Sequence, residues 1–266
     1  MNVLDLFSGI GGFSLGLERA GPFRTVAFCE REPFCQAVLR KHWPDTPIYD
    51  DVRTIPTDEL GDIDLICGGF PCQPWSVAGQ QRGTEDDRDL WPAMAALVKK
   101  LRPTWVIGEN VRGFVNEPMG LKRSLSDLES LGYEAAAFVI PACAVDAPHR
   151  RDRVWIVANS DNAIGRRGKE RRQGWYGRPA LHGAERLVAN ASGERSQVAT
   201  GDRSLERHRS SLDGSSPARW IIEPDVGRVA HGVPRRVDRL KALGNAVVPQ
   251  VVEQIGRAIL EVENAP

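Results

Sequence analysis

The chain has 266 residues, of which 41% are hydrophobic and 26% charged, and its formal net charge at pH 7 is zero. This is enough for one large domain with a hydrophobic core, or for one domain with a small appendage. The N-terminal residues lack the features of a signal peptide, and no apolar run is long enough for a membrane helix. We therefore expect a cytoplasmic protein that does not bind a membrane.

The cysteines and histidines do not follow the patterns of a disulfide-bonded or metal-binding protein. Five cysteines, an odd number without a CxxC pair, argue against both a disulfide framework and a zinc site. The five histidines show no spacing typical of metal ligands. We therefore expect no metal ion.

Short apolar runs alternate with helical patterns over residues 1–158. Strands are predicted at residues 2–7, 25–30, 64–70, 105–110, 134–140 and 153–158, with one more just before Asp51. Helices are predicted at residues 11–21, 33–43, 90–102 and 121–132. The alternation predicts an α/β fold with a doubly wound sheet. The last two strands, with no helix between them, should pair antiparallel.

The alternation stops at Asn159, and the charge changes there as well. Residues 1–158 carry 22 Asp and Glu against 17 Lys and Arg, a net charge of −5. Residues 159–219, which are poor in core-forming side chains, carry 7 against 12, a net charge of +5. Such a segment either attracts a polyanion or is a solvated insert, and charge alone leaves both open.

Residues 220–266 are predicted to return to the first part of the chain. An apolar stripe near the C-terminus predicts one buried helical face. It is formed by Val248, Val251, Val252, Ile255, Ile259 and Val262. The chain is therefore divided into residues 1–158, 159–219 and 220–266.

A glycine-rich turn follows the first predicted strand. The stretch "DLFSGIGGF" lets backbone N–H groups approach a ligand, although its spacing is not the dinucleotide pattern GxGxxG. Glu30 follows the second strand and Asp51 the third. Because ligands bind at the carboxyl ends of strands in open α/β sheets, these carboxylates could accept hydrogen bonds from a ribose and an adenine. The alternative is that both are solvated turn residues.

The stretch "GGFPCQPWS" presents Cys72 on a stiff turn, because Pro71 restricts the backbone there. Cys29, Cys35 and Cys67 lie among apolar residues and are expected to be buried, whereas Cys72 has polar neighbours. An exposed, firmly held thiol suits a nucleophile.

Glu109 and Asn110 in "GENV" end a neighbouring strand and should lie beside the Cys72 turn. A thiolate that adds to C6 of a pyrimidine, while a carboxyl group protonates N3, turns C5 into a nucleophile. These residues therefore suit conjugate addition to a pyrimidine.

Seven features occur in a fixed order: "DLFSGIGGF", Glu30, Asp51, "GGFPCQPWS", "GENV", "HRRDRVWIV" and "LGNAVVP". This ordered set resembles the DNA (cytosine-5) methyltransferases over nearly the whole chain. The resemblance implies a Rossmann-like doubly wound mixed sheet with a small, irregular target-recognition insert at 159–219. It implies methylation of C5 of a flipped-out cytosine in a specific double-stranded DNA sequence, with a covalent Cys72–C6 intermediate.

The resemblance also implies residue roles and partners. S-adenosyl-L-methionine is the implied methyl donor, and its implied site consists of Phe7, Ser8, Gly9, Gly11, Gly12, Glu30, Asp51, Val52 and Asn245. The implied catalytic residues are Cys72, Glu109, Arg151 and Arg153, with a surface charge cluster as the alternative for the arginines. Residues 73–89 match a loop that closes over DNA. We expect a monomer that acts on double-stranded DNA, with a cognate restriction endonuclease as a further partner in a restriction-modification system.

The sequence departs from the family pattern in two places. Residues 159–219 are short for a target-recognition domain, and the motif that precedes "LGN" is only partly visible in "VPRRVDRLKALGN". Two alternatives stay open, a cytosine-5 methyltransferase that acts on RNA and a DNA-binding regulator built on an inactive methyltransferase. "PCQ" followed by "ENV" favours DNA over RNA. The presence of Cys72, Glu109, Arg151 and Arg153 argues against an inactive protein.

Overall fold

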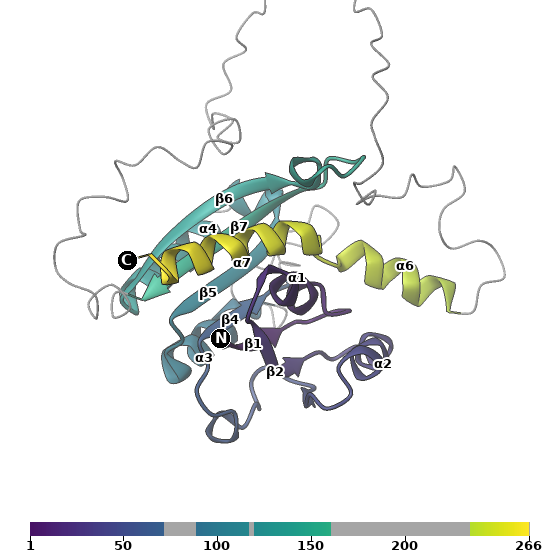
Figure 1. Ribbon diagram of the computed structural model, residues 1–266, viewed down its shortest axis with the longest axis horizontal. Helices are drawn as coiled ribbons and strands as arrows, with labels where there is room; N and C mark the ends of the chain where they lie inside the picture. Colours follow the sequence, from purple (N-terminus) through teal and green to yellow (C-terminus); the bar gives the residue numbers. More distant parts are fainter. Residues whose placement is uncertain (72–88, 117–119, 161–234, 266) are drawn as a thin grey trace, which may run out of the picture.

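The computed structural model describes residues 1–71, 89–116, 120–160 and 235–265. Within this part of the chain, a seven-stranded sheet in the order β3-β2-β1-β4-β5-β7-β6 forms the centre of the fold (Figure 1). The strands are β1 (Asn2–Leu6), β2 (Arg24–Cys29), β3 (Ile48–Tyr49), β4 (Leu65–Gly68), β5 (Trp105–Val111), β6 (Tyr133–Pro141) and β7 (Asp152–Ser160).

Helices pack on both sides of this sheet. The α-helices are α1 (Gly12–Ala20), α2 (Pro33–His42), α3 (Trp91–Leu101), α4 (Leu121–Ser130), α6 (Arg236–Asn245) and α7 (Pro249–Glu263). Short 3-10 helices are η1 (Thr57–Glu59), η4 (Arg112–Asn116) and η5 (Ala142–Val145). Among the described residues, no helix is both long and apolar enough to cross a membrane.

The sheet is mixed, as predicted. β1 pairs parallel with β2 and β4, and β2–β3 and β4–β5 are parallel as well. β7 is antiparallel to β6, which confirms the predicted pairing of the last two strands. The sequence did not predict that β7 also pairs antiparallel with β5 and so lies between β5 and β6.

Side chains alternate between two buried clusters along the central strands, because successive residues of a strand point to opposite faces. Leu4, Leu6 and Ile66 join the cluster that contains residues of α3 and α4. Val3, Leu65 and Cys67 join the cluster that contains residues of α1 and α7. The α3–α4 face and the α1–α7 face are therefore separate cores on either side of one sheet.

The helix α7 lies against α1, so that the end of the described chain packs against its beginning (Figure 1). The two helices approach closely at glycines. A Cβ at Gly16 would lie 2.5 Å from the carbonyl oxygen of Pro249, and one at Gly256 would lie 2.7 Å from the Cβ of Ala20.

The predicted apolar stripe of α7 is correct for most of its length and wrong at its end. Val251, Val252 and Ile259 are buried, but Val262 is 45% exposed. The two helices run in the same direction, since Gly16 meets Val252 and Gly21 meets Leu260. Val262 lies beyond the last residue of α1 and therefore has no helix to pack against.

The burial predicted for Cys29, Cys35 and Cys67 is confirmed. Cys143 is exposed, and Cys72 lies outside the described residues. The strand predicted at 153–158 continues to Ser160, and the rest of the basic segment 159–219 also lies outside the described residues.

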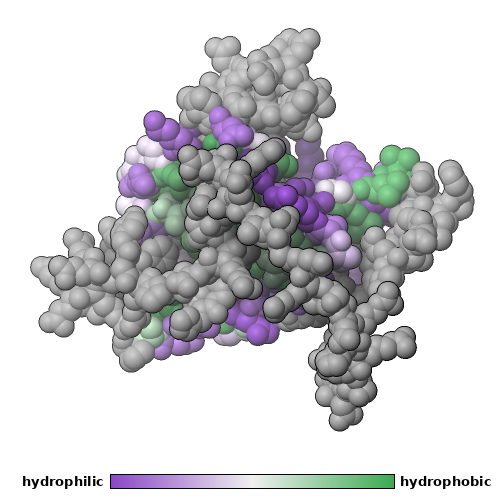
Figure 2. Space-filling model, turned by 90° about the horizontal axis from the view of Figure 1, so that it is seen from above, coloured by the Kyte–Doolittle hydropathy of each residue, from purple (hydrophilic) through white to green (hydrophobic). Residues whose placement is uncertain are grey.

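The helix α6 was not predicted from the sequence. Three of its apolar side chains are exposed, namely Val237, Leu240 and Leu243, so it has no buried apolar stripe. Figure 2 shows that hydrophobic residues reach the surface beside hydrophilic ones on the face that it views.

Candidate active site

The predicted site residues that the structure describes gather at one edge of the sheet. Strands β1 to β5 are parallel to one another, so their carboxyl ends lie along the same edge. Because β7 runs antiparallel to β5, with Arg153 opposite Val111, its first residues lie at this edge too. The topology therefore brings Arg151 and Arg153 to the strand ends that carry the glycine-rich turn, Glu30 and Glu109.

Glu30 fixes the turn that follows β1. The backbone N–H of Gly9 donates to Glu30 Oε2 at 2.7 Å, and the N–H of Glu32 donates to Oε1 at 2.7 Å. Gly9 has φ +54, a conformation that glycine adopts without strain. Each carboxylate oxygen keeps a further lone pair, so Glu30 is oriented and can still accept hydrogen bonds from a ligand.

The glycines at the start of α1 are required by their neighbours. A Cβ at Gly11 would lie 2.5 Å from the ring of Trp43, and one at Gly12 would lie 2.7 Å from Cγ2 of Val247. Phe7, in the same turn, has φ +53 and a partly buried ring. The turn is thus enclosed by α2 on one side and by the C-terminal segment on the other.

Ser8, which belongs to this turn, ties it to Asp5 of β1. The hydroxyl of Ser8 donates to the carbonyl oxygen of Asp5 at 2.6 Å. The Asp5 side chain accepts from the Ser14 hydroxyl at 2.7 Å, while its Oδ1 is buried without a hydrogen-bond partner in the described part of the chain. Burial raises the pKa of Asp5 to about 7. No role for Asp5 was predicted from the sequence, although an acid inside an apolar strand is a visible signal.

Asp51 faces its neighbour Arg53. Its Oδ1 accepts from the Arg53 backbone N–H at 2.9 Å, and its Oδ2 accepts from Nη2 at 2.9 Å. The hydrogen bonds from Arg53 lower the pKa of Asp51, so the carboxylate is charged at neutral pH. The next residue, Val52, is buried and belongs to the core on the α3–α4 side.

Glu109 forms an ion pair with Arg153 across β5 and β7. Glu109 Oε1 lies 2.9 Å from Arg153 Nε, and the side chains are 11% and 21% exposed. Burial raises the pKa of Glu109 to about 7, against the opposing effect of Arg153 and Arg151. Near neutral pH the carboxyl group is therefore available both with and without its proton.

The carboxyl group of Glu109 also lies against the chain that leads to Cys72. A Cβ at Gly69 would lie 3.2 Å from Glu109 Oε2, so glycine leaves room for the carboxylate there. Cys72 itself, three residues further on, lies outside the described residues.

Asn110 holds the same stretch of chain from the other face of the sheet. Its Nδ2 donates to the carbonyl oxygen of Phe70 at 3.1 Å, and its Oδ1 accepts from the N–H of Val111 at 2.9 Å. The sequence placed Asn110 beside the turn but gave it no role. A buried amide must be satisfied by hydrogen bonds, and here one of them fixes the residue two positions before Cys72.

Arg151 contacts the C-terminal segment. Its Nη2 donates to the carbonyl oxygens of Gly244 at 2.7 Å and Ala246 at 2.8 Å, on either side of Asn245. Burial, with the nearby Arg153, lowers the pKa of Arg151. Asn245, the exposed last residue of α6, is therefore tied to the edge that carries Glu109. The sequence did not indicate this contact.

A family model described as C-5 cytosine-specific DNA methylase matches residues 1–166. The chain belongs to this family.

Curated relatives agree with this assignment. The type II methyltransferase M2.BsuMI of Bacillus subtilis (strain 168) is 38% identical over 172 residues, which cover 60% of this chain and 42% of the relative. M.HhaI of Haemophilus parahaemolyticus, also a type II methyltransferase, is 32% identical over 160 residues, which cover 59% and 48%. The chain thus spans about half the length of the curated relatives it matches.

Solved structures confirm the predicted methyltransferase fold. A protein described as a prophage-encoded DNA modification methyltransferase of E. coli is 27% identical, with a TM-score of 0.54 over 62% of this chain and 48% of that one. A DNMT2 variant of Spodoptera frugiperda is 22% identical, with a TM-score of 0.52 over 60% and 50%, and shows similarity of fold alone.

Proposed function

We propose that this chain methylates C5 of a flipped-out cytosine in a specific sequence of double-stranded DNA, with S-adenosyl-L-methionine as methyl donor. The observation that carries the proposal is the Glu109–Arg153 pair, at 2.9 Å and mostly buried. It combines a carboxyl group of pKa about 7 with a guanidinium, directly beside the stretch that leads to Cys72. A proton donor poised near neutrality is what conjugate addition to a pyrimidine requires.

The edge formed by β1, β2 and β3 fits the cofactor. No described atom lies within 4 Å of a Cβ placed on Gly9, so the backbone there is open to a ligand. Glu30, held by the Gly9 and Glu32 amides, would accept hydrogen bonds from the ribose hydroxyls, and Asp51 would accept one from the adenine amino group. Phe7, Ser8, Gly11, Gly12, Val52 and Asn245 complete the proposed site. The bound cofactor supplies an activated methyl group.

The protein side chains act on the cytosine ring. The thiolate of Cys72 forms a bond to C6, while Glu109 gives its proton to N3, and the electron pair released to C5 makes that carbon a nucleophile. After C5 has gained the methyl group, the C5 proton is lost to solvent, the C6–S bond breaks as the C5–C6 double bond re-forms, and N3 returns its proton to Glu109. Arg153 orients Glu109, and Arg151 holds the segment that carries Asn245 against this centre.

Residues 1–158 form the catalytic and cofactor-binding domain in this proposal, and residues 220–266 return to it. Residues 159–219, with their net charge of +5, recognise the target through phosphates and base edges. The protein acts as a monomer in the cytoplasm, and a restriction endonuclease that cuts the same site is its functional partner.

Bisulfite sequencing of DNA from cells that express the chain tests the activity and finds the target. A duplex with 5-fluorocytosine at that target then tests the chemistry, because the fluorine at C5 cannot be eliminated and the enzyme stays attached. The wild type should give a covalent adduct on denaturing gels.

Cys72→Ala should form no adduct and should still bind S-adenosylhomocysteine. An adduct with Cys72→Ala would overturn the assignment of the nucleophile. Transfer of labelled methyl groups to RNA but not to DNA would support the RNA methyltransferase alternative instead.

A further inference from the structure

The stretch that precedes Cys72 is packed against the first turn of α3. The Phe70 side chain is 3% exposed, and its ring centroid lies 5.1 Å from that of Trp91 and 5.4 Å from that of Phe114. Trp91 comes three residues after the end of segment 72–88. The described residues on either side of this 17-residue segment therefore meet at one aromatic contact, between Phe70 and Trp91.

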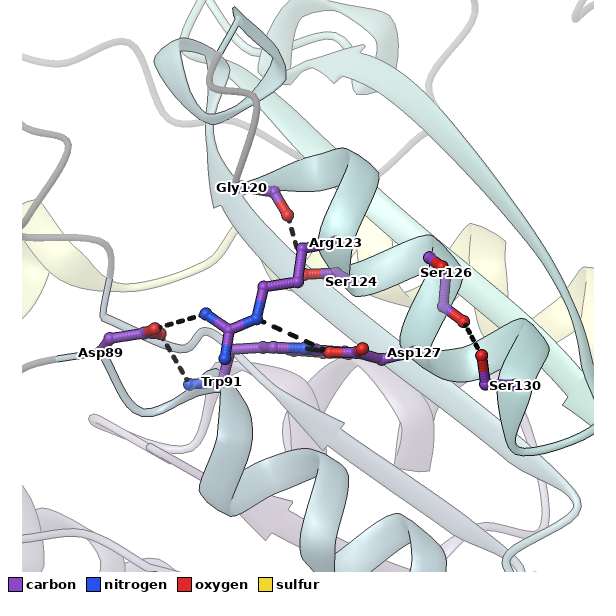
Figure 3. Close-up of polar contacts among 8 residues, drawn as sticks. All are labelled: Asp89, Trp91, Gly120, Arg123, Ser124, Ser126, Asp127 and Ser130. Carbon is purple, nitrogen blue, oxygen red and sulfur yellow. Dashed lines mark hydrogen bonds and ion pairs between the residues drawn. The ribbon is translucent and has the colours of Figure 1, made fainter. Parts of the chain in front are cut away.

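A polar cluster holds Trp91 in place (Figure 3). Arg123 Nη1 lies 2.7 Å from Asp89 Oδ2, and the Asp89 side chain is only 10% exposed. Asp89 Oδ1 accepts from the Trp91 backbone N–H at 3.3 Å. Asp127 accepts from Trp91 Nε1 at 2.8 Å and lies 3.8 Å from Arg123 Nε. Two carboxylates thus fix Trp91: Asp89 holds its backbone and Asp127 holds its indole. Arg123 contacts both carboxylates.

The cluster is also tied to the strand that carries Glu109. Arg123 and Asp127 belong to α4, which begins directly after Gly120. A Cβ at Gly120 would lie 2.8 Å from the carbonyl oxygen of Phe114, so the start of α4 is pressed against η4, which follows β5. Arg123 therefore connects α3 to a helix that packs against η4, directly after the strand of Glu109.

We infer that Arg123 is a positioning residue for the proposed nucleophile. It holds Asp89 and, together with Asp127, fixes Trp91. The Trp91 ring in turn positions Phe70, which lies two residues before Cys72. The inference rests on the proposed function, since it concerns the placement of Cys72 relative to Glu109. A displacement of about 1 Å at a reacting centre can lower a rate by about 100-fold, so a loosened Phe70–Trp91 contact should slow bond formation more than it weakens binding.

The test measures the single-turnover rate of covalent attachment to a 5-fluorocytosine duplex that contains the target found by bisulfite sequencing. Arg123→Gln and Asp89→Asn should each slow attachment by about 10-fold or more. The double variant should be no more than about 2-fold slower than the slower single variant, because both changes break the same bond. Arg123→Lys, which keeps the positive charge, should restore most of the rate. Affinity for S-adenosylhomocysteine should be unchanged in all four.

A matched control is available in α7, where Arg257 Nη2 lies 2.7 Å from Oε1 of Glu253, whose side chain is 7% exposed. Arg257→Gln removes a comparable pair with a buried acid and should leave the attachment rate within about 2-fold of wild type. The inference is overturned if Arg123→Gln attaches at the wild-type rate, if the two single effects multiply in the double variant, or if Arg257→Gln slows attachment as strongly.

Two further outcomes have separate meanings. If Arg123→Gln does not fold, Asp89→Asn and its comparison with Arg257→Gln carry the same test, because Asp89→Asn breaks the same pair and leaves Arg123 beside Asp127. A wild type that does not attach to the duplex would contradict the proposed function itself. If the wild type attaches and Asp89→Asn attaches at the same rate, only the role of Arg123 is contradicted.

Discussion

Glu109 combines two properties that oppose each other. Its burial favours the protonated carboxylic acid, whereas Arg153 at 2.9 Å favours the carboxylate. The result is a pKa of about 7, well above the ordinary value of 4.5. An acid so placed can release its proton to a ring nitrogen and take it back within one reaction cycle.

This pKa predicts how the rate depends on pH. The proton donor is the protonated form, whose fraction falls as the pH rises through about 7, so the single-turnover rate should decline above that pH. The measurement is the methyl-transfer rate at saturating DNA between pH 6 and pH 9. Glu109→Gln should lower the rate by about 10²–10⁴-fold and abolish the decline, because an amide has no such proton. If the rate of Glu109→Gln still declines with pH, another titrating group causes the decline.

Glu30 and Asp51 should differ in how much they contribute to cofactor binding. Loss of a hydrogen-bond partner costs about 1–3 kcal/mol, and we expect both Glu30→Ala and Asp51→Ala to lose affinity for S-adenosylhomocysteine within this range. Glu30→Ala should lose more, since Glu30 also holds the Gly9 amide at 2.7 Å, whereas Asp51 is tied to Arg53. Calorimetric titration of both variants measures the difference. Unchanged affinity in both would place the cofactor elsewhere.

The proposed site residues could be named from the sequence because each follows a recognisable strand or turn, as Glu30 follows β2. Their partners could not. The contact of Arg151 with the carbonyl oxygens of Gly244 and Ala246 joins residues more than 90 positions apart. No local pattern records such a pairing, because it depends on where α6 ends in space.

The helices α1 and α7 are held together by close backbone contact. At Gly16 an added methyl group would lie 2.5 Å from the Pro249 carbonyl oxygen and 2.6 Å from Val252 Cβ. We therefore expect Gly16→Ala to lower the free energy of unfolding by about 1–3 kcal/mol, as overpacking in cores does. Urea denaturation measures the change. Gly113→Ala, where no described atom lies within 4 Å of the new Cβ, should stay within about 0.5 kcal/mol of wild type. Equal losses in both variants would contradict the packing argument.

Most strands and helices were predictable because burial imposes a period on their sequences. β4, β5 and α3 carry continuous or regularly spaced apolar residues, and the structure places them where expected. α6 was missed because its apolar side chains, Val237 among them, are exposed. Val262 was misplaced because the stripe continues in the sequence beyond the point where α1 ends. Periodicity identifies an apolar face but not the length of the element that covers it.

The order of strands could not be predicted, because pairing joins parts of the chain that are distant in sequence. β7 inserts between β5 and β6, and this insertion brings Arg153 opposite the end of β5. The motifs alone show that Glu109 and Arg153 occur in order. Only the topology makes them neighbours.

The proposed roles of the chain segments predict which segment determines the DNA target. Residues 159–219 carry a net charge of +5 and residues 1–158 a net charge of −5, so DNA contact is assigned to the former. Replacing 159–219 with the equivalent stretch of a relative that has another target should transfer that target. Sequencing of methylated sites is the measurement. An active chimera that keeps the original target would move recognition elsewhere, for instance to residues 220–239.

The basic segment should also determine how binding depends on salt. Neutralising Arg166, Arg167, Arg171 and Arg172 together should weaken binding to any DNA sequence. Each lost phosphate contact should lower the slope of log affinity against log salt concentration by roughly 0.9. Titrations of a labelled duplex at several salt concentrations give this slope. If the variant keeps the wild-type slope, these four arginines do not contact phosphates.

The packing of α7 on α1 has a consequence for how the protein is made on the ribosome. α7 is synthesised about 230 residues after α1. Translation adds about 5–20 residues per second, so the apolar face of α1 that carries Phe13 and Leu17 stays uncovered for on the order of 10–50 s before α7 can pack against it. The chain around Asn245, which Arg151 anchors, emerges only moments before α7. Throughout this delay the nascent chain therefore exposes a hydrophobic surface to which chaperones can bind. The proposed site cannot assemble until both the chain around Asn245 and α7 have been synthesised.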